Sequence, residues 1–359
     1  MRDKTLIIAE AGVNHNGSLD TALNLVNVAA QSGADIVKFQ SFKSKKLVTN
    51  TAEKAEYQIK NTGSAASQQS MLKKLELSVS DHLRLFNECK ALNIEFLSTP
   101  FEQESLEFLV NNLRLHRLKI PSGEITNAPL LLKFAQSGCE IILSTGMSTL
   151  SEIEVALGVL AFGMTQEKSK SPSLRAFQQA YNSDEGQAAL RAKVSLLHCT
   201  TEYPAPIDEI NLRVIDTLNA AFQLPVGYSD HSEGIFIPIA AVAKGAKIIE
   251  KHFTLDRNME GPDHVASLEP NELKEMVSQI RLTEKALGSS TKLVTGSEEK
   301  NMTIARKSLV AAKAIKKGEI FSEDNLTVKR PGSGITPLSY WSYIGWPANQ
   351  DYEEDQVIE

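Results

Sequence analysis

Eight short apolar runs, each followed by a helical pattern, alternate along the first 287 residues of the chain. Each run is continuously apolar rather than alternating in polarity, which is typical of strands that helices cover. Strands that alternate with helices form a parallel sheet, and eight such units that close on themselves form a (β/α)8 TIM barrel. The runs cover residues 6–10, 35–40, 95–100, 117–122, 140–145, 193–200, 224–231 and 246–253.

An open, doubly wound sheet is the structural alternative to the barrel. That fold commonly carries a G-x-G-x-x-G motif after a strand, and no such motif follows any of the runs. Eight equivalent units also fit a closed ring better than an open sheet. The sequence therefore predicts a fold of the α/β class, with a (β/α)8 barrel over residues 1–287.

The character of the sequence changes after Gly288. Residues 288–302 are polar and are predicted to form a linker. In residues 303–359, short alternating runs are broken by turn signals such as KKGE and PGSG, which predicts a small, mostly β domain. A core of this size is marginal alone, so we expect this domain to pack on a barrel, its own or a partner's. Residues 163–192 are a long polar insertion, which we expect to be a surface excursion without a catalytic role.

Composition excludes several classes of partner. The net charge is −6 and the pI about 5.8, so electrostatics do not favour nucleic acid or an anionic membrane. The first apolar run is short and interrupted by Glu10, unlike a signal peptide, and no run approaches the roughly 20 apolar residues of a membrane span. Cys89, Cys139 and Cys199 are odd in number and far apart, which favours a reducing cytoplasm.

Polar and ionisable side chains gather where the predicted strands end. In a closed barrel the active site lies at the carboxyl ends of the strands, so this asymmetry indicates an enzyme. The strand-end positions include Glu10, Lys38, Gln40, Thr99, Lys119, Ser122, Glu124, Ser144, Thr200, Thr201, Tyr203, Ser229, Asp230, His231, Glu250 and His252.

Two lysines stand among these positions, Lys38 and Lys119. Ammonium groups that project into a barrel need anions to offset their desolvation. Hydroxyl groups and backbone N–H groups beside them would complete a cradle for a phosphate or an oxyanion. The alternative is that the lysines pair with glutamates of the barrel. No Walker A motif is present, so a nucleoside triphosphate is not indicated.

Two histidines end neighbouring predicted strands, His231 in GYSDH and His252 in IEKHF. Imidazole suits transition metals such as Mn, Fe, Co and Zn. Two protein ligands leave positions open for substrate, as Lewis-acid catalysis requires. The alternative is that both histidines belong to the core. The carboxylates of Glu10, Glu124 and Asp263 could serve as general acid or base, or pair with the lysines.

The motifs together resemble the sialic acid (N-acetylneuraminate) synthase family, which includes N,N'-diacetyllegionaminate synthases. The motifs that carry this resemblance are IIAEAGVNHNGSL, VKFQ, LSTPF, KIPSGEITN, ILSTGM, LLHCTTEYPAP, GYSDH, IEKHFTLD, GPDH and VKRPGSGI, in this order. The resemblance implies a barrel followed by a small antifreeze-like SAF domain of the β-clip type, in a domain-swapped homodimer. It also implies condensation of phosphoenolpyruvate with an N-acetylated mannosamine-type sugar, with release of phosphate and a divalent metal, most often Mn²⁺.

The resemblance assigns roles to individual positions. His231 and His252 match the metal ligands, Glu124 matches the residue that handles protons, and Arg330 matches an arginine that reaches the sugar from the other subunit. The positions that match phosphoenolpyruvate contacts are Lys38, Thr99, Lys119, Ser122, Ser144 and Ser229. The positions that match groups around the acceptor sugar are Glu10, Gln40, Tyr203 and Asp263.

One position departs from the family pattern and bears on the acceptor. Sialate-making members carry Asn after the HC motif, where this chain has Thr200 and Thr201, and we include Thr201 among the substrate contacts. Two acceptors stay open, N-acetylmannosamine and a 2,4-diacetamido-2,4,6-trideoxy-mannose. Two other functions also stay open. One is a Schiff-base aldolase with Lys38 or Lys119 as nucleophile, and the other is a non-enzymatic sugar-binding protein.

Overall fold

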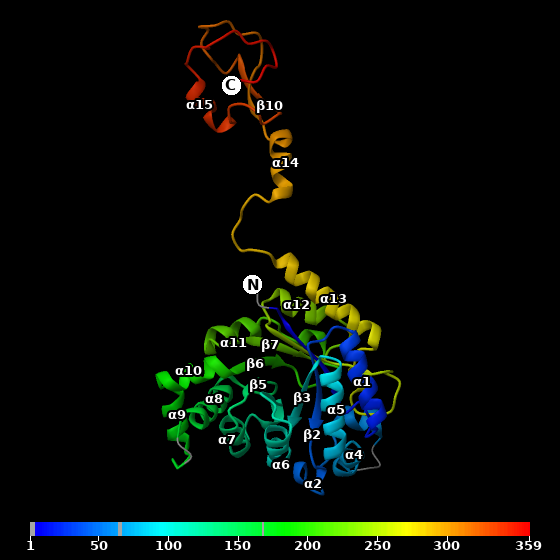
Figure 1. Ribbon diagram of the computed structural model, residues 1–359. Coiled ribbons are helices and arrows are strands. Elements are labelled where there is room, and N and C mark those ends of the chain that lie inside the picture. Colours follow the sequence, from blue (N-terminus) through cyan, green and yellow to red (C-terminus); the bar gives the residue numbers. More distant parts are fainter. Residues whose placement is uncertain (1–3, 64–66, 167–168) are drawn as a thin grey trace. The chain divides into compact units, whose positions relative to one another are not determined.

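The computed structural model describes residues 4–63, 67–166 and 169–359 (Figure 1). The chain divides into two compact units, with the boundary in the sequence between Gly288 and Ser289. Each unit has a hydrophobic core of its own. The first unit contains the predicted barrel, and the second contains the small C-terminal domain.

The first unit is an eight-stranded, near-closed barrel of parallel strands. Hydrogen bonds join the strands in the order β3-β2-β1-β8-β7-β6-β5-β4, and the two ends of this ladder, β3 and β4, lie against each other. The predicted barrel is confirmed, and the open doubly wound sheet is wrong. The strands are β1 (Leu6–Gly12), β2 (Ile36–Ser41), β3 (Glu95–Pro100), β4 (Arg117–Ile120), β5 (Glu140–Ser144), β6 (Val194–Cys199), β7 (Val226–Asp230) and β8 (Ile248–His252).

Helices cover the outside of the strand ring (Figure 1). Their apolar positions recur every three or four residues and so face the strands. In α1, for example, Ala22, Leu25, Val26 and Ala29 are buried, and the Ser18 hydroxyl caps the first turn. The covering helices are α1 (Leu19–Gln31), α5 (Val79–Ala91), α6 (Gln103–Glu107), α7 (Ala128–Gln136), α8 (Leu150–Thr165), α11 (Val214–Phe222), α12 (Phe236–Ala243) and α13 (Pro270–Leu287).

Two excursions interrupt this pattern. The segment after β2 forms three short helices, α2 (Ser44–Leu47), α3 (Glu56–Thr62) and α4 (Gln68–Lys74). The insertion over residues 163–192 forms α9 (Leu174–Tyr181) and α10 (Asp184–Lys193), while its residues 167–168 lie outside the described part. Both insertion helices pack on α8, where the rings of Phe162 and Phe177 meet edge to face. The insertion is therefore attached to the outer helical layer.

The barrel interior is built in layers because alternate residues of a strand face the same side. An apolar layer fills the middle, and the residue two positions further along each of the same strands is polar or ionisable. The apolar layer consists of Ile8, Ile36, Leu97, Ile142, Leu197 and Ile248. The layer above it includes Glu10, Lys38, Thr99, Ser144, Cys199 and Glu250. This apolar layer, which we call the plug, fills the barrel beneath the polar layer.

The second unit begins with α14 (Gly296–Ala305), followed by β9 (Ser308–Ala311), β10 (Leu326–Lys329) and the short α15 (Tyr340–Tyr343). The second half of the predicted linker over residues 288–302 is thus helical. The hydroxyl of Thr295 and the carboxylate of Glu298 form a capping box that starts α14. The signal for this helix was present in the TGSEE segment.

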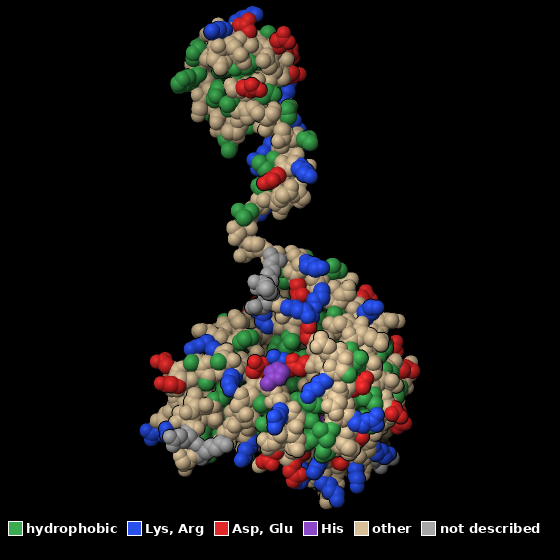
Figure 2. Space-filling view, in the orientation of Figure 1, with side chains coloured by type: hydrophobic (Ala, Val, Ile, Leu, Met, Phe, Trp, Pro, Cys, Tyr) green, Lys and Arg blue, Asp and Glu red, His purple; other side chains and the backbone are tan. Residues whose placement is uncertain are grey.

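The surface carries mixed charge. On the face shown in Figure 2, basic and acidic side chains are interspersed rather than gathered into a field of one sign. This distribution agrees with the modest net charge of −6. Within the described ranges, no helix is both long enough and apolar enough to cross a membrane.

Candidate active site

A cavity of about 360 Å³ opens at the carboxyl ends of the barrel strands. Every predicted site residue except Arg330 lines it, and Arg330 belongs to the second unit. The predicted residues that line the cavity are Glu10, Lys38, Gln40, Thr99, Lys119, Ser122, Glu124, Ser144, Thr201, Tyr203, Ser229, His231, His252 and Asp263. The structure therefore brings together residues from all eight strand ends.

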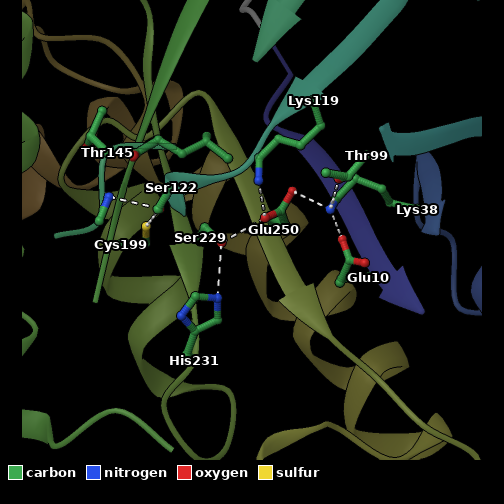
Figure 3. A network of polar contacts seen from close by, with 12 residues as sticks. Glu10, Lys38, Thr99, Lys119, Ser122, Thr145, Cys199, Ser229, His231 and Glu250 are labelled. Atoms are coloured by element: carbon green, nitrogen blue, oxygen red, sulfur yellow. Dashed lines mark hydrogen bonds and ion pairs between the residues drawn. The ribbon is translucent and has the colours of Figure 1, made fainter. Parts of the chain in front are cut away.

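Two lysines and two glutamates form a buried network at the floor of this cavity (Figure 3). Lys38 forms an ion pair with Glu10, and its Nζ lies 3.4 Å from Glu250 Oε2. Lys119 Nζ donates to Glu250 Oε1 over 3.1 Å, and Ser229 Oγ donates to the same oxygen over 2.8 Å. Here the lysines pair with barrel glutamates, the alternative that the sequence left open. Glu250 contacts both lysines. It was predicted to lie at a strand end, two residues beyond the apolar Ile248, but no role in the site was assigned to it.

The four charged groups of this network differ in their electrostatics. Burial raises the pKa of Glu10 to about 7, against the opposing effect of Lys38. Burial also acts to raise the pKa of Glu250, but Lys119 and Lys38 outweigh it and hold that pKa below its usual value. Burial lowers the pKa of Lys119. Burial also acts to lower the pKa of Lys38, but Glu10 and Glu250 outweigh it and keep the pKa of Lys38 above its usual value. Glu10 is thus the carboxyl group of this network that changes its charge near neutral pH.

Hydroxyl groups line the same cavity as the two lysines. The side-chain oxygens of Ser144 and Thr201 are buried and have no hydrogen-bond partner among the described residues. Gly146 N donates to Ser122 Oγ over 3.0 Å, and a Cβ at Gly146 would lie 2.3 Å from Thr201 Oγ1. Thr200 instead donates its hydroxyl to a backbone carbonyl 3.3 Å away. Unsatisfied buried hydroxyls beside two ammonium groups are suited to bind an anion.

The two predicted metal ligands meet in the same cavity, with ring centroids 5.7 Å apart. His231 Nδ1 donates to the carbonyl oxygen of Thr200 over 2.6 Å, which leaves a lone pair on Nε2. That Nε2 lies 3.1 Å from the hydroxyl of Tyr203. His252 Nδ1 is buried and has no hydrogen-bond partner among the described residues.

Burial keeps both imidazoles neutral, lowering the pKa of His231 to about 4 and the pKa of His252 well below its usual value. Neutral imidazole is the form that binds metals. In the described part of the chain, no group of three or more His, Cys, Asp or Glu side chains is placed to hold a metal ion. The two neutral imidazoles, which line one cavity, are a donor set that suits a cation whose other positions are open to water or substrate.

An ion pair outside the strand ring supports the histidines. Asp230 and Lys251 precede His231 and His252, so they point to the opposite side of their strands. Lys251 Nζ lies 2.6 Å from Asp230 Oδ2, and both side chains are 0% exposed. Asp230 Oδ1 also accepts hydrogen bonds from the N–H and the hydroxyl of Ser232. This pair ties β7 to the end of β8.

Removing Lys251 is expected to destabilise the fold strongly. Lys251→Met leaves the buried Asp230 carboxylate without its cation, which costs about 3–5 kcal/mol of unfolding free energy. Urea unfolding would measure this loss. The matched control is Lys244→Met, which removes a pair with Asp216 whose side chains are 39% and 57% exposed and so costs less than about 1 kcal/mol. Equal losses for the two variants would contradict the role of the buried pair.

The cavity lining also includes Tyr57, which the sequence did not single out, and the predicted residues Asp263 and Glu124. Tyr57 comes from α3, and its ring centroid lies 5.0 Å from that of Tyr203. Burial raises the pKa of the nearby Asp263 carboxyl to about 6. Glu124 lies in the 3-10 turn Ser122–Glu124, where its Oε2 accepts a hydrogen bond from Asn127 Nδ2 over 2.6 Å. Tyr57 follows no strand, so the reading of strand ends could not find it.

The fold and the cavity together define a (β/α)8-barrel enzyme with a floor of lysines and hydroxyls and two neutral histidines. Comparisons with known proteins agree. Residues 25–292 match the NeuB family, and residues 306–359 match the SAF domain. The chain therefore belongs to the NeuB family, and the predicted resemblance and the predicted SAF domain are confirmed.

Individual relatives sharpen this placement. The chain is 54% identical over 355 residues to the N,N'-diacetyllegionaminic acid synthase of Campylobacter jejuni, covering 99% of both chains. It is 44% identical to the protein of the same name in Legionella pneumophila, covering 94% of this chain and 89% of that one. The crystal structure of the N-acetylneuraminic acid synthetase of Leptospira borgpetersenii, in complex with citrate, matches with a TM-score of 0.67 and 34% identity. That match covers 83% of this chain and 90% of the other.

Proposed function

We propose that this chain is a nonulosonate synthase that condenses phosphoenolpyruvate with an N-acetylated mannosamine-type sugar and releases phosphate. The observation that carries the proposal is that one cavity holds both a lysine and hydroxyl floor and a pair of neutral histidines. The floor suits an anionic substrate, and the histidines suit a cation that activates a carbonyl group. The named synthases that share 54% and 44% identity with the chain support an enzyme over a non-enzymatic sugar-binding protein.

Phosphoenolpyruvate carries a phosphate and a carboxylate, and we place both groups at the floor of the cavity. Lys38 and Lys119 supply positive charge there, and the hydroxyls of Ser144 and Thr201 supply free donors. Thr99 hydrogen-bonds Lys38 over 3.1 Å and holds its ammonium group in place. When an anion binds, it competes with Glu10 and Glu250 for the lysines. The residues assigned to this floor are Lys38, Thr99, Lys119, Ser122, Ser144, Thr201 and Ser229.

The reaction forms one carbon–carbon bond and breaks one carbon–oxygen bond. C3 of phosphoenolpyruvate adds to the aldehyde carbon of the open-chain sugar, and C2 becomes electron-poor. Water adds to C2, and phosphate leaves when the C2–O bond breaks, so phosphoenolpyruvate, sugar and water give a 2-keto sugar acid and phosphate. Glu124, oriented by Asn127, is the group that we assign to proton transfer. A divalent cation held by His231 and His252, Mn²⁺ in our assignment, would polarise the aldehyde oxygen as a Lewis acid.

The acceptor is the second part of the proposal. Both curated relatives described above are named for diacetylated legionaminic acid. This favours a 2,4-diacetamido-2,4,6-trideoxy-mannose over N-acetylmannosamine. We assign Gln40, Tyr203 and Asp263 to the sugar, because they line the same cavity as the lysine floor. We also assign Glu10 to the sugar, from its place in the floor beside Lys38.

Phosphate release tests the function directly. With phosphoenolpyruvate and Mn²⁺, we expect phosphate to appear when the diacetamido sugar is added, more slowly with N-acetylmannosamine, and not after a chelator is added. The lowered pKa of Lys119 favours a Schiff-base aldolase as the second candidate. That candidate predicts activity in chelator and covalent trapping of substrate by borohydride. Absence of phosphate with both sugars would overturn the synthase proposal.

The assembly that we propose is a domain-swapped homodimer in which Arg330 reaches the site of the partner barrel. The second unit exposes large apolar side chains, Leu338 at 90% and Trp341 at 79%. Two positions that follow barrel strands also expose large apolar side chains, Met147 in the turn after β5 and Phe236 at the start of α12. Exposed apolar surface of this kind is typical of interaction sites. Arg330 is itself exposed, and its Nε donates to a backbone carbonyl over 2.9 Å, which leaves its terminal nitrogens available.

A further inference from the structure

One wall of the active-site cavity is lined by six apolar side chains, which we call the apolar wall. It comes from the loops after β1 and β3, from α2 and α4, and from the turn after α4. Its members belong to a hydrophobic cluster that is separate from the barrel core, and all of them line the cavity. They are Val13, Leu47, Met71, Leu72, Leu75 and Phe101. A cluster that served packing alone would be closed off from the cavity, whereas this one forms part of its lining.

The polar side chains near the apolar wall are already engaged. Gln68 Nε2 donates to Gln58 Oε1 over 3.4 Å, and the same oxygen accepts the backbone N–H of Ala55 over 3.1 Å. The lysines and glutamates of the floor lie instead on the strand ends, in the layer that holds Glu10 and Lys38. A substrate hydroxyl pressed against the apolar wall would therefore lose water without gaining a partner there, which is unfavourable.

The reaction fixes which end of the sugar meets this wall, and this step rests on the proposed function. The aldehyde carbon C1 must lie beside His231 and His252, next to phosphoenolpyruvate on the lysine floor. C6 is the opposite end of an open-chain hexose and points away from the histidines. We propose that the apolar wall binds the C6 methyl group of a 6-deoxy acceptor and selects it over sugars that carry a 6-hydroxyl. Leu72 is the residue to change, because it is only partly buried and its side chain borders the cavity.

The expected discrimination is modest and measurable. A hydrophobic pocket separates ligands that differ by one small group by about 10- to 200-fold. We therefore expect kcat/KM for 6-deoxy-N-acetylmannosamine to exceed that for N-acetylmannosamine by at least about 10-fold. These two sugars differ only at C6, so the comparison is independent of the acetamido group at C4.

Two variants and a control locate the preference. Leu72→Asn nearly preserves side-chain size and puts an amide on the wall, so we expect the ratio of the two kcat/KM values to fall toward 1. Val13→Thr replaces one methyl group with a hydroxyl at a second position on the wall, and we expect a smaller fall in the same direction. The matched control is Leu83→Asn on α5, where a leucine that is 41% exposed lies outside the cavity. It should leave the ratio unchanged.

The outcomes separate this inference from the proposed function. Release of phosphate with both sugars but without preference for the 6-deoxy sugar would overturn the inference and leave the synthase proposal standing. A preference that survives in both wall variants, with normal thermal unfolding, would also overturn it. No phosphate with either sugar or with the diacetamido sugar would overturn both. A KM for phosphoenolpyruvate that stays constant while the sugar ratio falls supports the apolar wall as a site for the sugar alone.

Discussion

His252→Ala is expected to lower kcat by about 10³-fold or more while the barrel stays folded. The substitution removes one of the two nitrogens that we assign to the cation. Lewis-acid activation supplies several kcal/mol of transition-state stabilisation, and each 1.36 kcal/mol corresponds to about a tenfold change in rate. The fold should survive, because His252 Nδ1 has no hydrogen-bond partner among the described residues, so its loss breaks no bond of that nitrogen.

Two measurements check this prediction. Phosphate release reports the rate, and titration of Mn²⁺ into the protein reports binding without any turnover. The matched control is His116→Ala, since the His116 side chain is 68% exposed and lies at the opposite end of the barrel, before β4. Unchanged Mn²⁺ affinity in His252→Ala would show that the histidine pair is not the metal site, whatever happens to the rate.

The barrel and most of its site could be predicted because both follow from periodicity. The alternation of strand and helix gives the fold class, and the period of two along each strand gives the inward positions. On β1 and β2, for example, an apolar residue of the plug precedes a site residue by two positions. Ile8 precedes Glu10 on β1, and Ile36 precedes Lys38 on β2. The same rule, applied to Ile248 on β8, identifies Glu250. Glu250 was predicted to lie at a strand end, but no role in the site was assigned to it.

The residues that the excursion after β2 contributes to the cavity could not be predicted in the same way. Tyr57, Met71 and Leu72 come from the excursion after β2, where helices of only a few residues follow no strand. Short helices are positioned by tertiary packing rather than by local propensity. Their apolar residues could face the barrel core, the solvent or the cavity, and the sequence pattern is the same in all three cases. The acceptor specificity that we assign to this region was therefore open until the cavity lining was known.

The chain shows the same division between local and tertiary signals after the barrel. The start of α14 carries a T-x-x-E capping box at Thr295 and Glu298, a local signal that predicts a helix. The polar composition of the surrounding residues led instead to the prediction of a linker. Arg330 is the opposite case. It was assigned from a motif alone, and the role that we propose for it requires a second copy of the chain.

Mixing two impaired variants, Arg330→Ala and His252→Ala, is expected to restore activity if Arg330 acts across a dimer. Arg330→Ala alone should lower kcat/KM by about 10- to 100-fold, because a hydrogen bond from a charged group contributes about 1.5–3 kcal/mol. An Arg330→Ala chain keeps an intact barrel, and a His252→Ala chain keeps an intact arginine. After exchange of equal amounts, about half of the dimers are mixed, and each mixed dimer of this isologous kind has one complete site. The phosphate-release rate should therefore recover to roughly a quarter of the wild-type rate.

A double variant supplies the control for this experiment. A chain with both Arg330→Ala and His252→Ala cannot complete the site of an Arg330→Ala partner, so that mixture should stay at the level of Arg330→Ala alone. Subunit exchange is verified independently with chains of different mass. If exchange is complete and the first mixture recovers no more activity than the control, the arginine acts within its own chain. Recovery to about a quarter of the wild-type rate instead requires that each site be built from the barrel of one chain and the SAF domain of the other.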